Sequence, residues 1–220
     1  IKKANIKHVL TSRKVMDKFK FELDCEVCYL EDLKDKVTGV DKAVSALLGF
    51  VMPGFLVNRL LGLHKLKSDD VMTIVFTSGS TGVPKGVMLT QRNIMSNVQG
   101  INHVATFVPE DTMVGILPFF HSMGFTATLW APMACHLRGV YHFSPLDAKI
   151  VGKLTEKFAG TVIVATPTFL RSYMRRCTPE QFKSLNTVVA GAERLPSELC
   201  DEFEAKFGVR PVEGYGTTEL

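Results

Sequence analysis

Apolar and polar residues follow two different periods along the second half of the chain. Five runs of strand length are rich in apolar residues, the last of them ending in a turn: 112–117, 138–143, 161–166, 185–191 and 209–216. Apolar residues spaced by three and four, the period of a helix, occur in 90–105, 122–136, 146–158, 167–176 and 195–208. Strands that do not alternate between apolar and polar residues are typical of a parallel sheet with helices on both faces. The pattern therefore predicts an α/β fold.

The first third of the chain has a weaker pattern. A strand at 6–10 precedes a helix that Thr11 or Ser12 opens, and a second strand follows in "CEVCYLEDL", 25–33. The polar stretch "HKLKSDD", 64–70, is typical of a linker. We therefore expect an N-terminal α/β segment over 1–69 and an α/β core that binds the ligand over 70–220.

Residues 41–63 form the least polar stretch of the chain. No charged residue occurs in the sixteen positions 43–58, although Pro53 and Gly54 interrupt them. A helix that spans a bilayer needs about twenty apolar residues, so this stretch predicts a helical hairpin and no membrane span. Two interpretations remain open. The hairpin is a pair of core helices, or its apolar side chains, such as Phe50 and Phe55, contact a membrane surface or a partner.

A loop of small and polar residues, Thr77 to Gly86, lies between the apolar runs 72–76 and 87–89, which we expect to be two buried strands. Glycine lets the backbone approach a ligand closely, successive N–H groups form an anion-binding concavity, and Lys85 adds a charge suited to phosphate. The loop lacks the glycine and the final hydroxyl of a Walker A motif, and an extended segment follows it. This composition favours a phosphate-binding loop, with a plain surface turn as the alternative.

Composition narrows the class of ligand. The net charge of +4 suits an anionic small molecule, and no basic run with interleaved aromatic residues predicts nucleic-acid binding. Five scattered cysteines indicate a reducing compartment, and the pair Cys25 and Cys28 has no second pair to complete a metal site. No metal is assigned to the histidines that lack ligand spacing: His8, His64, His103, His136 and His142.

Three motifs together resemble those of the adenylate-forming superfamily. These are "TSGSTGVPKGV" (77–87), "ILPFFHSMGF" (116–125), and "VVAGAERLPSEL" followed by "EGYGTTE" (188–199 and 213–219). They occur in the order typical of the superfamily, and the resemblance covers most of the chain from Asp70 onward. It implies that the chain is the parallel-sheet, helix-covered portion of the large N-terminal domain of an adenylate-forming enzyme, truncated at both ends.

A closer resemblance is to the acyl-ACP synthetase domain of the bifunctional 2-acylglycerophosphoethanolamine acyltransferase/acyl-ACP synthetases, through "SPLDAK" (144–149) and "ATPTFLRSYMRR" (165–176). It implies that a fatty acid and MgATP give an acyl-adenylate and pyrophosphate, after which the acyl group passes to the thiol of acyl carrier protein. The alternatives are a long-chain acyl-CoA synthetase, which uses CoA, and a nucleotide-binding or scaffold module without turnover.

The resemblance also assigns roles to residues. Lys85, His121, Thr218 and Glu219 are the implied catalytic residues, with Glu219 and Thr77 as ligands of Mg²⁺. Tyr215 is expected to stack on adenine, and Thr218 to hydrogen-bond the α-phosphate. The implied nucleotide-binding residues are Thr77, Ser78, Gly79, Ser80, Thr81, Gly82, Lys85, Gly191, Ala192, Glu193, Gly214, Tyr215, Gly216, Thr217 and Thr218.

Two of these roles have plain structural alternatives. His121 in the superfamily lies by the carboxylate, but a histidine at the end of an apolar run is often structural. An acyl pocket is predicted from four aromatic residues that would also suit a hydrophobic core: Phe119, Phe120, Phe125 and Trp130.

The resemblance finally implies parts beyond Leu220, including a small C-terminal domain with a catalytic lysine. We therefore expect the 220 residues to be a piece of a longer protein that turns over poorly or not at all by itself. A cytoplasmic location is expected, and the parent protein and the apolar hairpin would place it at the inner face of the cell membrane through a peripheral contact.

Overall fold

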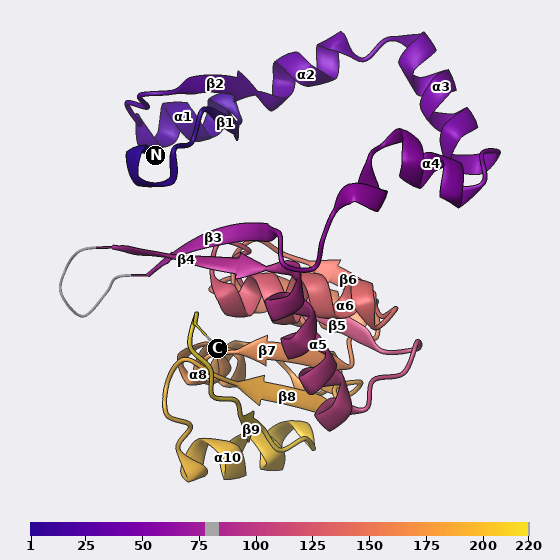
Figure 1. The fold of residues 1–220 in the computed structure, drawn as a ribbon. Coiled ribbons are helices and arrows are strands. Elements are labelled where there is room, and N and C mark those ends of the chain that lie inside the picture. The colour runs from indigo at the N-terminus through magenta and orange to yellow at the C-terminus, as the bar shows by residue number, and fades with distance from the viewer. Residues whose placement is uncertain (78–83, 220) are drawn as a thin grey trace. The chain divides into compact units, whose positions relative to one another are not determined.

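The computed structural model describes residues 1–77 and 84–219, apart from the side chain of Lys3. The chain divides into two compact units, Ile1–Asp70 and Val71–Leu220 (Figure 1). None of the helices in the described residues is long and apolar enough to cross a membrane.

The first unit contains a two-stranded sheet and several short helices. Its elements are η1 (Lys2–Ala4), β1 (His8–Thr11), α1 (Arg13–Phe19), β2 (Glu26–Tyr29), α2 (Leu30–Lys36), α3 (Gly39–Phe50), α4 (Gly54–Leu60) and η2 (Leu63–Lys65). The strands β1 and β2 pair in parallel, with His8 opposite Glu26. Ser12, one of the two predicted caps, accepts a hydrogen bond from the Val15 amide and so starts α1.

The apolar stretch 41–63 forms two helices, as the sequence predicts. The hydroxyl of Thr38 accepts a hydrogen bond from the Asp41 amide while the Asp41 carboxylate accepts one from the Thr38 amide, and this capping box starts α3. Pro53 interrupts the helical run and is the N-cap of α4. Neither helix contains a buried residue, so the interpretation as core helices finds no support within this unit.

The second unit holds the main sheet. Its elements are β3 (Val71–Thr77), β4 (Lys85–Thr90), α5 (Gln91–Ala105), β5 (Thr112–Gly115), the π-helix η3 (Gly124–Trp130), α6 (Ala131–Ala134), β6 (Arg138–Tyr141), α7 (Ala148–Lys157), β7 (Val162–Ala165), α8 (Pro167–Arg176), α9 (Pro179–Phe182), β8 (Thr187–Ala190), α10 (Ser197–Phe207) and β9 (Val212–Glu213). Five strands form a sheet in the order β6-β5-β7-β8-β9, and all neighbours pair in parallel. The predicted α/β fold with a parallel sheet is confirmed.

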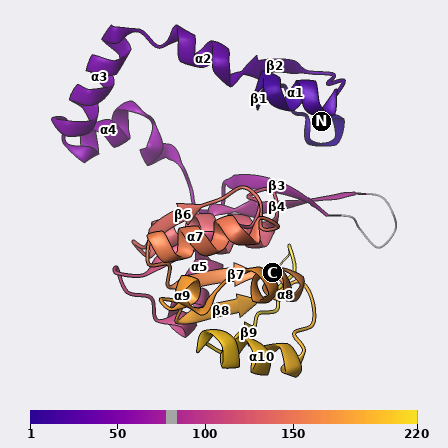
Figure 2. The ribbon, with the colours of Figure 1, turned by 180° about the vertical axis from the view of Figure 1, so that it is seen from behind.

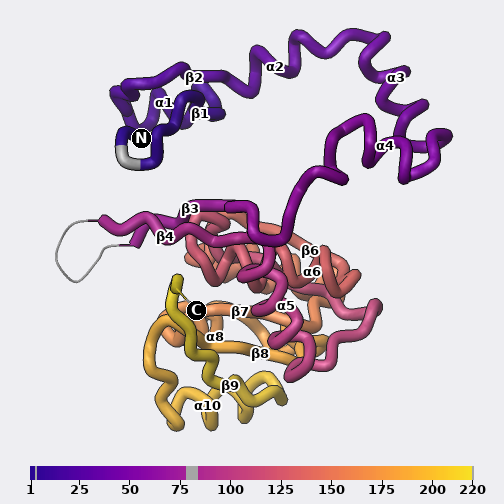
Figure 3. The backbone as a smooth tube through the Cα atoms, viewed as in Figure 1, coloured from indigo at the N-terminus to yellow at the C-terminus, as the bar shows by residue number. Residues whose placement is uncertain are grey.

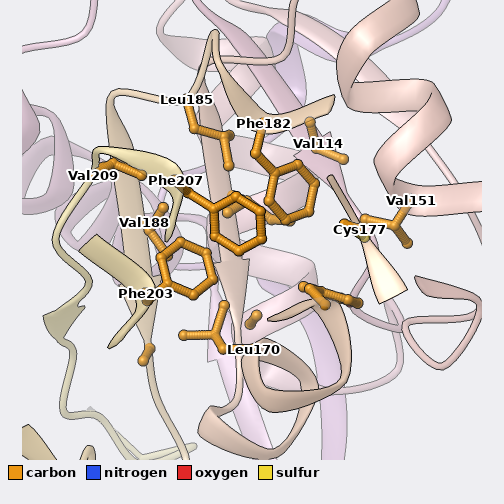
Figure 4. Packing of buried hydrophobic residues seen from close by; sticks show 14 of the residues in the cluster. Val114, Val151, Leu170, Cys177, Phe182, Leu185, Val188, Phe203, Phe207 and Val209 are labelled. Carbon is orange, nitrogen blue, oxygen red and sulfur yellow. The ribbon is translucent and has the colours of Figure 1, made fainter. Parts of the chain in front are cut away.

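Alternate strand residues face two hydrophobic clusters on opposite sides of this sheet. Val114 and Ile163 belong to the larger cluster, which helices α7 to α10 cover and in which Phe203 is fully buried (Figure 4). Met113 and Val162 belong to the other cluster. Figure 1 is seen from the side of α5, and Figure 2 from the side of α7 and α9. Burial on both faces explains why these strands are apolar throughout.

The two strands beside the predicted phosphate loop form a hairpin outside the parallel sheet. β3 and β4 pair in antiparallel fashion, and Figure 3 shows the chain turning from β4 directly into α5. The prediction that both strands are buried is wrong, because Val75 and Leu89 are the only buried residues described in them. An antiparallel ribbon can leave one side to solvent, whereas a central parallel strand cannot.

Two further elements differ from the predicted ones. The helix expected over 122–136 is a π-helix that continues into α6, and the Ala131 amide donates to the carbonyl of Thr126, five residues earlier. Pro132 has no amide to donate to the preceding turn, and such interruptions are a common cause of local widening. The strand expected over 209–216 is reduced to Val212–Glu213.

The thiol of Cys177 offers a test of the larger cluster. Burial raises its pKa to about 11, and its Sγ donates to the carbonyl oxygen of Ala148. At a pH near the ordinary thiol pKa of about 8.5, we expect Cys177 to resist a disulfide reagent until the second unit unfolds, while the partly exposed Cys25 and Cys28 react at once. Peptide mapping after timed labelling measures this. Labelling of Cys177 as fast as Cys25 in the native protein would contradict the packing.

Candidate functional site

Several of the predicted site residues follow the carboxyl ends of parallel strands. His121 lies in the segment after β5, Gly191 directly follows β8, and Gly214 directly follows β9. The strand order places β6 on one side of β5 and β7 on the other. The connection after β5 and the connection after β7 therefore leave in opposite directions across the sheet. Ligands of open α/β sheets bind outside the carboxyl ends of the strands at such a point. The topology therefore gathers the segments of two motifs at one edge.

A hydrogen bond joins the histidine segment to the last motif. The hydroxyl oxygens of Ser122 and Thr218 are 3.3 Å apart, although the two residues are separated by 96 positions. Both side chains are only partly buried, so their remaining hydrogen-bonding capacity is available to a ligand. This pair is the most direct evidence that the two motifs form one site.

His121 is held in a defined turn beside this pair. Its amide donates to the carbonyl of Pro118, its carbonyl accepts from the Phe125 amide, and its Nδ1 accepts from the Met123 amide at 3.3 Å. An imidazole that accepts through Nδ1 carries its proton on Nε2 when it is neutral. The side chain is exposed, so Nε2–H can serve as a donor to a ligand.

Gly124 makes this turn possible. A Cβ at this position would lie 2.1 Å from the carbonyl oxygen of Pro118 and 3.0 Å from that of Leu117. These are backbone atoms, which cannot move aside without displacing the turn that carries His121. A larger residue at the start of the π-helix therefore requires this turn to shift.

The side chain of Met123 lies against Gly191. A Cβ on Gly191 would lie 2.5 Å from its Cε and 3.1 Å from the carbonyl oxygen of Gly214. The amides of Gly191 and Gly214 donate to the last residues of the neighbouring strands, Ala165 and Ala190. Close packing thus brings three motif segments into contact, and it gives the two glycines a structural role beside the predicted binding role.

The segment after β8 has an unusual backbone. Ala192 has a φ of 66°, in the left-handed region that few residues other than glycine adopt. Glu193 accepts a hydrogen bond of 2.7 Å from the hydroxyl of Thr168, the second residue of α8. Strain of this kind is common at binding sites, and the contact ties the predicted adenine segment to the end of β7.

The last motif is exposed. Tyr215 is 89% exposed, and Gly216, Thr217 and Glu219 are exposed as well. This exposure excludes a core role for Tyr215 and leaves its ring accessible to a flat ligand.

The predicted phosphate loop is described only at its ends. Thr77 and Lys85 are opposite each other at the ends of β3 and β4, and Lys85 is exposed. The predicted residues Ser78, Gly79, Ser80, Thr81 and Gly82 lie outside the described residues. In the part of the chain that the structure describes, the cluster around Ser122 and Thr218 does not include Lys85, so their joint role stays a prediction.

The four aromatic residues predicted to line an acyl pocket separate into two pairs. Phe125 and Trp130 pack at a centroid distance of 6.2 Å in a cluster with Val75 and Leu89 of the hairpin. Phe119 lies edge-on to Tyr141, and burial raises the pKa of the Tyr141 hydroxyl. Phe120 is 83% exposed. The first pair thus packs against a core cluster, and the second pair follows the carboxyl end of β5, so an acyl pocket stays a prediction.

Sequence reasoning missed three residues of this site: Ser122, Met123 and Thr168. Ser122 directly follows His121, so its position within the histidine motif could have indicated a role in the site. Thr168 follows a buried strand at the start of a helix, where a hydroxyl is often close to a ligand. The role of Met123 depends on contacts between distant segments, which the sequence does not display.

The structure also brings together His8, Glu26 and Cys28, which no motif had connected. Their ligand atoms lie within 4.8 Å of one another because β1 and β2 pair in parallel. His8 Nδ1 is 2.9 Å from a Glu26 oxygen, and both side chains are well exposed. A surface contact between His8 and Glu26 therefore accounts for their closeness.

The described residues suit a nucleotide and its magnesium ion. The Ser122 and Thr218 hydroxyls can donate to a phosphate, and the exposed Tyr215 ring can stack on a base. The exposed Glu219 carboxylate and the Thr77 hydroxyl are hard oxygen ligands of the kind Mg²⁺ takes beside phosphate. The chemistry of the donor set therefore fits the predicted ligands.

Comparison with known sequences identifies a family for this chain. The family model described as "AMP-binding enzyme" matches residues 1–220. The chain is 30% identical over 168 residues to a long-chain-fatty-acid–CoA ligase of Bacillus subtilis. This match covers 73% of this chain and 30% of that protein. It is 29% identical over 220 residues to 4-coumarate–CoA ligase 1 of Petroselinum crispum. This match covers 88% of this chain and 38% of that protein. The chain thus spans between 30% and 38% of the length of these relatives.

Comparison with solved structures identifies the same fold. ATP-bound MatB of Rhodopseudomonas palustris superimposes with a TM-score of 0.73 at 22% identity, covering 97% of this chain and 40% of that one. This likeness confirms the predicted fold class. The closer relation to acyl-ACP synthetases is not shown, because the two relatives above are CoA ligases. Since the family model matches the whole chain, the chain belongs to the AMP-binding enzyme family.

Proposed function

We propose that this chain forms part of an ATP-dependent ligase that activates a carboxylic acid and transfers the acyl group to a thiol. The carboxylate oxygen bonds to the α-phosphorus of ATP as the bond to pyrophosphate breaks, and the acyl-adenylate then reacts with the thiol and releases AMP. The observation that supports the proposal most directly is the hydrogen bond between Ser122 and Thr218. It joins the histidine motif, which we expect to lie by the carboxylate, to the last motif, which we expect to bind the α-phosphate.

The chain's residues act by positioning and by screening charge. A carboxylate and a triphosphate repel each other, so fixed donors and cations must offset their charges. The Nε2–H of His121 orients the carboxylate, and the Ser122 and Thr218 hydroxyls donate to the α-phosphate. Lys85 holds the departing phosphates at the loop end of the hairpin. Magnesium, bound through Glu219 and Thr77, would neutralise phosphate charge.

A long-chain fatty acid is the proposed substrate class. The apolar rings of Phe119 and Phe120 at the carboxyl edge support it, as does the similarity to the Bacillus subtilis fatty-acid ligase. The proposed acceptor is acyl carrier protein, supported by the resemblance of segments 144–149 and 165–176 to acyl-ACP synthetases. CoA is the second candidate, since the two relatives described above are CoA ligases.

Thermal stabilisation by ligands tests the proposal. The melting temperature of the chain is measured with MgATP alone and with non-hydrolysable acetyl, octanoyl and palmitoyl adenylate mimics. Each buried methylene adds about 0.8 kcal/mol of affinity, and bound ligand raises the melting temperature by mass action. We expect the shift to grow with chain length. A shift that is flat with chain length would reject the fatty acid, and no shift with any ligand would reject a nucleotide site in this chain.

The acceptor is tested on the longer protein that contains this chain. Purified acyl carrier protein and CoA are offered separately with radiolabelled palmitate and MgATP. Acylation of the carrier protein alone supports the first candidate, and formation of palmitoyl-CoA alone supports the second.

Substitution of Thr218 by valine should weaken the MgATP site. Valine keeps the shape but removes a hydroxyl that donates to a charged phosphate, an interaction worth about 1.5–3 kcal/mol. We expect the dissociation constant measured by calorimetry to rise about tenfold or more. Thr73→Val on β3 is the matched control. Equal affinity of Thr218→Val and the wild type would remove Thr218 from the phosphate site.

A further inference from the structure

The two strands of the first unit bring three side chains of different chemistry together. β1 and β2 pair in parallel, with His8 opposite Glu26 and Leu10 opposite Cys28 (Figure 1). Successive side chains of a strand point to opposite faces of a sheet, so His8, Glu26 and Cys28 share one face. One ligand atom from each of these three lies within 4.8 Å of the other two, and among the described residues no other such group is found.

The face that carries this group is open to solvent. The side chains of His8 and Glu26 are 62% and 68% exposed, whereas Val9 and Val27, which point to the other face, are partly covered. An ion can therefore reach the three ligand atoms from solvent. The exposed side chains can also rotate toward an ion without disturbing a core.

The three donor atoms suit a zinc ion. Zinc takes thiolate sulfur, imidazole nitrogen and carboxylate oxygen, whereas magnesium and calcium take oxygen. Tetrahedral zinc places neighbouring donors roughly 3.3–3.6 Å apart, given its bond lengths to nitrogen, oxygen and sulfur. His8 Nδ1 lies 2.9 Å from a Glu26 oxygen, and every pair in the group is within 4.8 Å. Small rotations of the side chains thus bring the group to the spacing that zinc needs.

The first unit has few other contacts that could hold its two strands together. No residue whose burial is described between Ile1 and Asp70 is buried. A sheet of two strands is marginally stable without a hydrophobic face that packs on other elements. Small folded units with a limited core are often stabilised by a metal ion. An ion bound by one residue of β1 and two residues of β2 would supply such a link.

We propose that His8, Glu26 and Cys28 bind one zinc ion that joins β1 to β2. His8 binds through Nδ1 and Glu26 through a carboxylate oxygen. Cys28 binds through its sulfur after the thiol has released its proton to solvent. One thiolate and one carboxylate neutralise the charge of the ion, and a water molecule completes the tetrahedron. The site lies wholly within the first unit, and the proposal is independent of the proposed ligase activity.

Cobalt substitution in the whole 220-residue chain tests the ligands. A thiolate that coordinates cobalt(II) gives an intense absorption band in the near ultraviolet, which imidazole and carboxylate ligands do not give. A phosphine reductant keeps the thiols reduced, and excess magnesium occupies sites made of oxygen ligands alone. We expect the band to saturate at one cobalt ion per chain and to disappear when zinc, which binds more tightly, displaces cobalt. Absence of the band, or no saturation at one ion per chain, would overturn the proposal.

Matched variants assign the band to these residues. Cys28→Ser should abolish it. His8→Gln and Glu26→Gln should each raise the dissociation constant for zinc, measured by competition with a chromophoric chelator, about tenfold or more, since loss of even an outer partner of a ligand costs that much. Cys25→Ser, at another partly exposed thiol of the same segment, and His64→Gln, at another exposed histidine, should change neither readout. A band that survives Cys28→Ser, or that Cys25→Ser also removes, would reject this set of ligands.

Hydrogen exchange measures whether the ion joins the strands. The Glu26 amide donates to the carbonyl of Lys7, so exchange at this amide reports on the contact between the two segments. Zinc at a hundred times its dissociation constant should slow exchange in peptides of β1 and β2 by up to about a hundredfold, because strands that separate must release the ion. Peptides of β7 are the internal control and should not change. Equal exchange of β1 and β2 with zinc and with a chelator would overturn the proposed link.

Discussion

Replacement of Gly124 by alanine is expected to lower the free energy of unfolding of the second unit by about 2–3 kcal/mol. The added methyl group would overlap the carbonyl oxygen of Pro118, 2.1 Å away, and backbone atoms cannot move aside as a flexible side chain can. The turn Pro118–His121 must then shift, and with it the Ser122 hydroxyl that contacts Thr218. We therefore expect MgATP binding to weaken together with stability.

Urea unfolding followed by Trp130 fluorescence measures this effect, because the only tryptophan of the chain lies in the second unit. Gly100→Ala is the matched control: it lies inside α5, and apart from its chain neighbours and the helix's own backbone no atom comes within 4 Å of the added Cβ. Alanine there should stabilise the protein by about 0.5–1 kcal/mol, since glycine is a poor residue in a helix interior. Equal midpoints for Gly124→Ala and the wild type would show that the turn adapts at no cost.

Substitution of Phe203 by alanine is expected to cost about 3–5 kcal/mol, the range for large-to-small changes of buried aromatic residues. The side chain is fully buried between the sheet and α10 (Figure 4), with ring centroids 4.7 Å from Phe207 and 6.4 Å from Phe182. Its removal leaves a cavity that neighbouring rings can fill only in part. A loss of this size is a large part of the stability of an ordinary domain.

The same urea experiment with Phe143→Ala provides the control. Phe143 is 87% exposed, and surface substitutions of this kind usually change stability by less than about 0.5 kcal/mol. A cost below about 1 kcal/mol for Phe203→Ala would contradict a tightly packed cluster. Retained MgATP binding by the folded variant at low temperature would show that this cluster supports the site without forming it.

The site depends on both sides of the sheet in different ways. The cluster around Phe203 fixes the strands, so their carboxyl ends form a stable edge. On the other side, Met123 packs against the cluster of Met113 and Val162 and also lies against Gly191, so it links the packing of that face to the site. The binding residues themselves lie on segments after the strands, where they can approach a ligand without loss of core packing.

Much of the local structure was predictable from the sequence because local rules decide it. Thr90 starts α5 with a capping box completed by Asn93, and Gly208 ends α10 in the left-handed conformation that suits glycine. The apolar runs became the strands of the parallel sheet, since only strands buried on both faces need to be apolar throughout. The family resemblance likewise depended on short motifs, each of which is contiguous in the chain.

The sequence by itself thus determined most strands and helices of the second unit, the fold class and the family of this protein. Only the tertiary structure decided that β3 and β4 form a partly exposed hairpin outside the main sheet, and that Ser122 meets Thr218 across 96 positions. It also decided that Met123 lies against Gly191 and that Phe125 and Trp130 pack in a core. The physical reason is that hydrophobic period and capping act over a few residues. Contacts between distant segments instead follow from the order in which the strands pair.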